Sequence, residues 1–161
     1  MTIADFSGLS KVRPEKSLVS GKQRISGRNN LGRVTVRHRG GGHKRLLRQI
    51  DFRQMDKNGV PGTVKTIEYD PNRTAYIALI QYADGDKRYI LAPEGLKVAD
   101  TVVCADRTKV KPGNRMRLMN VPVGYRIYNI EMQMGRGGQM VRSAGAGATL
   151  VGFDAPYALI E

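Results

Sequence analysis

The sequence predicts an all-β protein with an extended basic segment at its N-terminus. Two observations carry this prediction. Lys and Arg outnumber Asp and Glu by 12 to 2 in residues 1–50, a net charge of +10, but only by 15 to 12 in residues 51–161. From residue 51 onward the chain consists of short apolar runs separated by turn residues. Strands spaced about 8–12 residues apart, with turns between them, are typical of small β-barrels and sandwiches.

Residues 1–52 form the predicted basic arm. In residues 1–50 only 15 side chains are apolar, or 30%, against 40% for the whole chain. So little apolar surface does not offset the entropy of ordering, and we expect this arm to be extended and to become ordered on its partner. The arm has few local signals of secondary structure: polar and apolar residues alternate at 33–37, and a short run at 44–50 suits a helix. Its charge favours a polyanionic partner, of which nucleic acid is the commonest.

Residues 53–120 are predicted to form one small β-barrel. The expected strands lie at 62–69, 75–82, 87–93 and 101–104, with turns at 70–73 and 111–114. Asp84-Gly85 predicts a hairpin, because glycine tolerates the positive φ that such turns need. The run at 76–82 is rich in branched and aromatic residues, which suits a strand buried on at least one face.

Residues 121–161 begin a second β-unit after a turn at 122–124. The run at 125–133 resembles a strand, and a glycine-rich basic stretch at 135–147 leads into another strand near 148–152. About three strands are marginal as an independent domain. We therefore expect this unit to be one that the chain does not complete.

The sequence predicts neither an enzyme nor a metal or cofactor site. GRNNLGRV (27–34) has the glycine spacing of a phosphate-binding P-loop, but Arg33 and Val34 stand where that loop needs Lys and Ser or Thr. His38 and His43 lack the spacing of a helical zinc pair, and Cys104, the single cysteine, suits a small buried side chain. No apolar run approaches the roughly 18 residues that span a bilayer.

The composition of the arm indicates how it binds. No aromatic residue lies between residues 7 and 50, so base stacking is not its mode of binding. Arginine and lysine suit phosphates, and the triple glycine at 40–42 lets the main chain lie directly against phosphate or sugar. A flexible surface loop is the alternative explanation for these glycines, and tight turns are the alternative for those at 135–147.

Several stretches together resemble large-subunit ribosomal protein L2. They are SGRNNLGRVTVRHRGGGHKR (26–45), YILAPEGLKV (89–98), KPGN (111–114), VPVG (121–124), NIE (129–131) and GRGGQMVRSAG (135–145). The resemblance spans about residues 15–150. It implies an OB-like barrel at 53–120 and the beginning of an SH3-like barrel at 121–161, with the basic arm threading into large-subunit rRNA. It also implies support of the peptidyl-transferase region, subunit association and tRNA binding, with RNA as the catalyst.

The resemblance assigns rRNA contacts residue by residue. The expected RNA-binding residues are Arg28, Asn29, Asn30, Arg33, Arg37, His38, Arg39, Gly40, Gly41, Gly42, His43, Lys44 and Arg45 in the arm, with Gly135, Arg136, Gly137, Gly138 and Arg142 in the second unit. Other ribosomal proteins are expected partners. Members of this family continue past residue 161, so we expect a second polypeptide to complete the SH3-like barrel, with a fragment of a longer chain as the competing explanation. Such a split gene favours the mitochondrial matrix, with the bacterial cytoplasm as the alternative. The rival hypothesis is a free-standing RNA-binding regulator.

Overall fold

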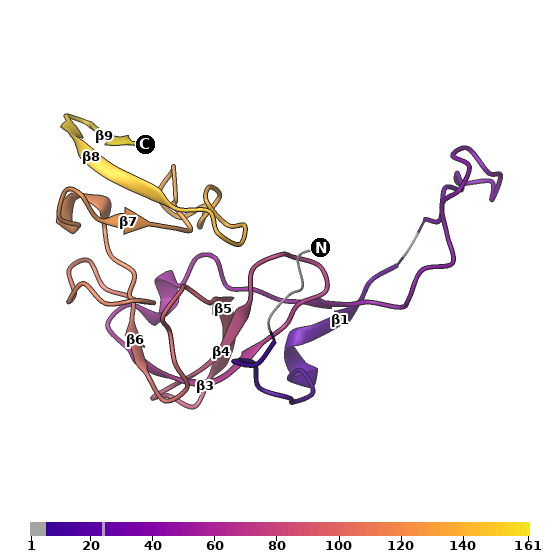
Figure 1. The fold of residues 1–161 in the computed structure, drawn as a ribbon, viewed down its shortest axis with the longest axis horizontal. Coiled ribbons are helices and arrows are strands. Elements are labelled where there is room, and N and C mark those ends of the chain that lie inside the picture. The colour runs from indigo at the N-terminus through magenta and orange to yellow at the C-terminus, as the bar shows by residue number, and fades with distance from the viewer. Residues whose placement is uncertain (1–5, 24) are drawn as a thin grey trace.

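The structure is a computed structural model, and it describes residues 6–23 and 25–161. Within these residues the regular elements are β-strands and three short 3-10 turns, at Lys16–Leu18, Met55–Lys57 and Leu118–Asn120. No α-helix occurs among them, and the all-β prediction is confirmed. Figure 1 shows three parts: a projecting loop, a first unit around β3 to β6, and a second unit that carries β7 to β9.

The first unit is built on an antiparallel sheet in the order β5-β4-β3-β6. Its strands are β3 (Pro61–Glu68), β4 (Ile77–Tyr82), β5 (Lys87–Leu91) and β6 (Thr101–Val103), each within two residues of its predicted bounds. The predicted hairpin joins β4 to β5, and Gly85 has a φ of +87° there. The sequence of this unit therefore predicts its strands correctly.

Strand β4 is the centre of the first unit, because both of its faces are buried. One face carries Ala78, Ile80 and Tyr82 into a core that also contains Val64, Ile90, Leu96 and Val102. The other face carries Ile77 and Leu79, which pack with Tyr89 against Leu18 and Ile50. The second core thus fixes the N-terminal segment to the sheet.

The N-terminal segment differs from the extended arm that the sequence predicts. It forms a loop that is closed at its base by two paired strands. Strand β1 (Val19–Gly21) pairs antiparallel with β2 (Leu46–Arg48), and residues 22–45 lie between them. The expectation of a helical turn at 44–50 is wrong, because residues 46–48 form strand β2 and pair with β1. Ahead of β1, the Ser10 N–H donates to the Ile67 carbonyl at 2.8 Å, and the Glu15 N–H donates to the Tyr89 hydroxyl at 3.0 Å. Hydrogen bonds to the first unit therefore order the segment that leads into the base of the loop.

The second unit is a three-stranded sheet in the order β7-β8-β9. Its strands are β7 (Arg126–Ile127), β8 (Ala148–Asp154) and β9 (Tyr157–Ile160). The predicted strand at 125–133 is reduced to β7 and one isolated bridge, Ile130 to Met140, because Asn129 has a left-handed φ of +51° that breaks the extended run. Similarly, the alternation at 33–37 leaves a single bridge, Arg28 to Val34.

Candidate nucleic-acid interface

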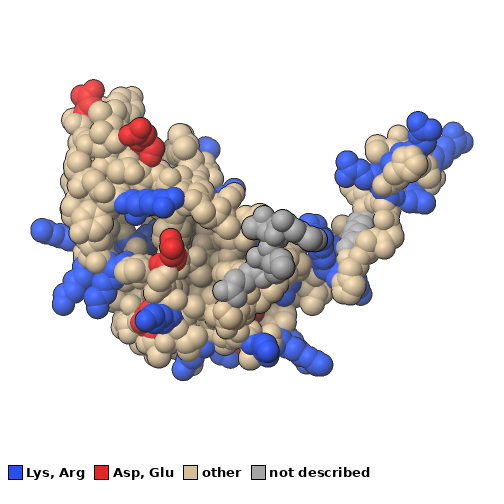
Figure 2. Space-filling model, in the orientation of Figure 1, with Lys and Arg blue, Asp and Glu red and all other residues tan. Residues whose placement is uncertain are grey.

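The projecting loop, residues 22–45, is the most basic part of the molecule. It contains eight Lys or Arg residues and no Asp or Glu. Figure 2 shows basic but no acidic side chains on the projecting loop, whereas both kinds lie on the body of the protein. All thirteen residues predicted to bind RNA in this loop are exposed. The loop therefore presents an uncompensated positive charge away from the rest of the protein.

Two contacts at the base direct the loop outward. The Arg45 guanidinium donates to the Pro71 carbonyl at 2.9 Å, and Lys22 Nζ donates to Asn72 Oδ1 at 3.2 Å. Both partners belong to the turn between β3 and β4. Arg45 is thus shared between its predicted RNA contact and this anchor.

The tip of the loop has internal structure that the sequence did not reveal. Asn29 Oδ1 accepts hydrogen bonds from the Leu31 and Arg33 N–H groups, at 3.0 and 2.9 Å. The Gly27 carbonyl accepts from the Thr35 N–H at 2.8 Å and from its hydroxyl at 3.1 Å. Because these bonds close the turn, the tip loses less conformational entropy on binding than a disordered arm would. Asn29 has a structural role at the tip, and its RNA contact stays a prediction.

The triple glycine contains two residues with unusual backbone conformations. Gly40 has a φ of +142° and Gly41 a φ of +68°, which side chains rarely allow. A Cβ added at Gly41 would meet no atom within 4 Å, so its surroundings are open. Here the backbone is open to another molecule, and backbone contact with RNA stays a prediction.

The glycine-rich stretch of the second unit is placed differently. Gly137 and Gly138 are buried, and the Gly138 N–H donates to the Phe52 carbonyl at 3.0 Å. A Cβ at Gly137 would lie 3.0 Å from the same carbonyl oxygen. These glycines therefore allow close packing between the two units. Of this stretch, Arg136 and Arg142 are exposed, and RNA contact by Gly135 to Gly138 stays a prediction.

Two residues that the sequence did not single out join Arg142. The Arg142 guanidinium carbon lies 5.0 Å from the centre of the Phe52 ring, and that of Arg73 lies 6.0 Å from it. Arg73 comes from the segment between β3 and β4, for which the sequence predicts only a turn. The aromatic ring at the end of the basic arm was the available signal. Figure 1 places the loop tip far from the second unit, so the predicted contacts form two separate groups.

A crevice of about 1410 Å³ separates the two units, and three of the other arginines that line it are already bonded. Arg115 pairs with Glu131 at 2.6 Å, and Arg117 pairs with Asp106 at 2.9 Å. Arg126 donates to the Gly145 carbonyl at 3.0 Å. In the part of the chain that the structure describes, Arg142 has no carboxylate within 4.0 Å, so its charge is available to an outside anion.

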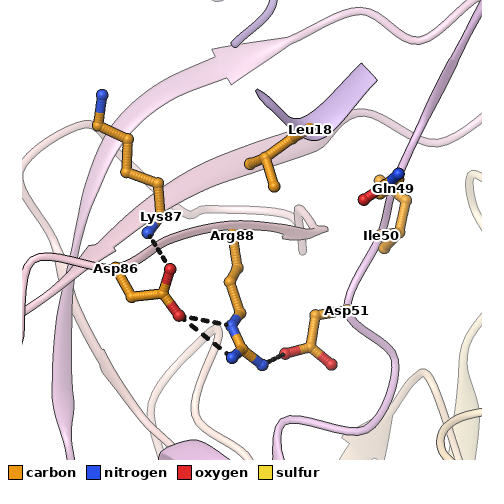
Figure 3. A pocket seen from close by; sticks show the side chains of 7 residues that line it. All are labelled: Leu18, Gln49, Ile50, Asp51, Asp86, Lys87 and Arg88. Carbon is orange, nitrogen blue, oxygen red and sulfur yellow. Dashed lines mark hydrogen bonds and ion pairs between the residues drawn. The ribbon is translucent and has the colours of Figure 1, made fainter. Parts of the chain in front are cut away.

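Arg88, unlike Arg142, is surrounded by carboxylates. It lies beside a smaller hollow of about 320 Å³ at the loop base (Figure 3). Its guanidinium donates to Asp51 and Asp56 and to Asp86, at 2.7, 2.5 and 3.1 Å. The hydrogen bond to Asp56 is the main cause of the raised pKa of Arg88. Three carboxylates neutralise this cation, and no phosphate site remains here.

The remaining titratable groups have structural explanations. Asp84 and Asp86 both pair with Lys57, whose hydrogen bonds lower the pKa of each carboxyl. Burial raises the pKa of the Cys104 thiol, so the reactive thiolate is disfavoured. Among residues 6–23 and 25–161, no three His, Cys, Asp or Glu side chains gather as a metal site would require. None of those residues forms a helix with the length and hydropathy that crossing a bilayer needs.

An acid-free basic loop that projects from a small all-β scaffold defines the class as an RNA-binding structural protein. Comparison with known families agrees with this class. Residues 15–104 match the family described as Ribosomal Proteins L2, RNA binding N-terminal domain, and residues 111–161 match Ribosomal Proteins L2, C-terminal domain. The chain belongs to the ribosomal protein L2 family. It is a non-enzymatic structural constituent of the large ribosomal subunit.

Proposed function

We propose that this chain binds large-subunit rRNA mainly through the projecting loop, residues 22–45. The observation that carries the proposal is that the loop has eight basic residues and no acidic residue, and that its described part projects from the packed units. Phosphate contacts by Lys and Arg release counterions from RNA and supply affinity that depends little on sequence. The preformed tip then adds shape recognition, which suits folded RNA better than single strands.

The second group of contacts is the exposed Arg142 beside Arg73 at the junction of the units. Together the two groups would bind RNA at separated points, and this fixes the orientation of the protein on the subunit. Such bracing is how the chain would support the peptidyl-transferase region, subunit association and tRNA binding. That part of the proposal rests on the family resemblance, and RNA remains the catalyst.

Exposed apolar side chains on the sheet of the second unit indicate a further protein partner. Leu150 in β8 is fully buried, whereas Phe153 on the same strand is 47% exposed and Leu159 on β9 is 50% exposed. An apolar sheet that is only partly covered gains free energy from further strands. We propose a second polypeptide as their source, with the mitochondrial matrix as the compartment and the bacterial cytoplasm as the alternative. Mass spectrometry of salt-washed large subunits tests this, because peptides running past residue 161 would refute a separate polypeptide.

Incorporation into ribosomes tests the role of the loop. Changing Arg37, Arg39, Lys44 and Arg45 to Ala should block incorporation into large subunits. A control variant with Lys65, Lys97, Arg107 and Lys109 changed to Ala removes the same charge from the first unit and should incorporate. Normal incorporation of the loop variant would refute the proposal, and absence of the wild-type chain from subunits would favour a free RNA-binding regulator.

A further inference from the structure

Phe52 connects three segments of the chain that are far apart in sequence. Its half-buried ring is contacted by Arg73 of the first unit and by Arg142 of the second. Its carbonyl accepts the Gly138 N–H at 3.0 Å. One residue, a few positions after the loop base, thus contacts both the turn between β3 and β4 and the glycine-rich stretch.

The backbone around Phe52 is fixed from the other side. Asp51 Oδ1 accepts hydrogen bonds from the Arg53 and Gln54 N–H groups, both at 2.9 Å. Asp51 Oδ2 in turn accepts from Arg88 at 2.7 Å. Because both neighbours of Phe52 are held, the backbone that carries the ring has a fixed position beside the two arginines.

The two cations at the ring differ in their available charge. Arg73 Nε donates to Asp70 at 2.6 Å, and Asp70 is completely buried. Arg142 is exposed and has no carboxylate partner in the described chain. A long exposed side chain without a partner would otherwise sample many rotamers, and stacking on an aromatic face limits them. The ring therefore prepares Arg142 to meet an anion in one orientation.

We propose that Phe52 is a positioning residue for RNA binding: its ring holds the Arg142 guanidinium, beside Arg73, toward an rRNA phosphate at the junction of the two units. This inference rests on the proposed function, because its ligand is the rRNA backbone. It also means that the segment after the basic loop and the second unit bind RNA as one body.

The test uses the full chain and an in vitro transcript of large-subunit rRNA from the same organism. Affinity is measured at several KCl concentrations for wild type, F52L, F52Y, R142A, R142K and F52L/R142A, after thermal unfolding has shown which variants fold. F52L should weaken binding about two- to fivefold, as expected for an exposed cation–π contact, and F52Y should retain it. R142A should reduce the slope of log affinity against log salt by about 1. Adding F52L to R142A should weaken binding by less than about twofold, because the two changes remove one interaction.

R142K provides a second test that leaves the half-buried ring intact. Lysine keeps the charge but lacks the planar guanidinium that stacks on the ring, so R142K should weaken binding by about the same factor as F52L with the salt slope unchanged. The inference is overturned if R142K binds as wild type does, or if F52L weakens R142A as much as it weakens wild type. If the wild-type chain does not bind the transcript, or R142A is without effect, the proposed contact itself fails and the inference fails with it.

Discussion

Replacing Gly138 with alanine tests whether the glycine-rich stretch is tightly packed against its surroundings. A Cβ at Gly138 would overlap the Asn129 side-chain amide and lie 2.7 Å from the Asn129 carbonyl oxygen. Asn129 has little freedom to retreat, because it has a left-handed φ and its Oδ1 is buried without a hydrogen-bond partner among the described residues. Overpacking of this kind costs about 1–3 kcal/mol. Displacing the Gly138 N–H from the Phe52 carbonyl adds about 1 kcal/mol.

The G138A variant should therefore lose about 2–4 kcal/mol of unfolding free energy, measured by urea denaturation. For a chain of this size, each kcal/mol corresponds to roughly 2–4 °C in Tm. The matched control is G152A, in the same unit, since a Cβ at Gly152 would meet no atom within 4 Å. G152A should remain within about 0.5 kcal/mol of wild type.

Equal stability of G138A and G152A would refute the packing role. A G138A variant that unfolds normally but loses rRNA affinity would instead assign Gly138 to direct contact with RNA. That result would support the RNA contact that the sequence predicts for Gly138.

Three further predictions concern the first unit. I80A should lose about 2–5 kcal/mol of unfolding free energy in urea denaturation, because Ile80 is fully buried in the main core; a loss under 1 kcal/mol would contradict that core. Hydrogen bonding to Lys57 lowers the pKa of Asp84 and Asp86 below 3.8, so their stabilisation is present above that pH and is lost as the pH falls through the lowered values. Acid titration of K57M should show a shallower loss than wild type, and identical curves would refute the pairing. Burial raises the pKa of the Cys104 thiol above 9.0, so its alkylation at pH 7.5 should be slower than that of glutathione; an equal rate would contradict the burial.

The strands of the first unit were predictable because local signals and tertiary packing agree there. Turn residues such as Asp84-Gly85 separate runs whose side chains are buried in the structure. The second face of β4 could not be predicted, since Leu18 and Ile50 reach it from the N-terminal segment. Long-range packing of this kind leaves no periodic signal in the sequence.

The basic segment was correctly predicted in charge but not in shape. Its low apolar content suggested disorder, yet Asn29 and Gly27 close the tip through hydrogen bonds that composition does not reveal. The short strand β2 was likewise hidden, because residues 46–48 are ordered by pairing with β1. In the second unit, the left-handed conformation of Asn129 interrupted a run whose composition suits a strand.

The most direct test of the central claim is the salt dependence of rRNA binding with and without the projecting loop. The pairing of Gly21 with Leu46 allows residues 22–45 to be replaced by an Asn-Gly turn that keeps β1 and β2 joined. Since the loop carries eight basic residues, its removal should lower the slope of log affinity against log salt by about 4–7, while the first unit stays folded. An unchanged slope in a folded variant would contradict the account and assign the RNA interface to another surface.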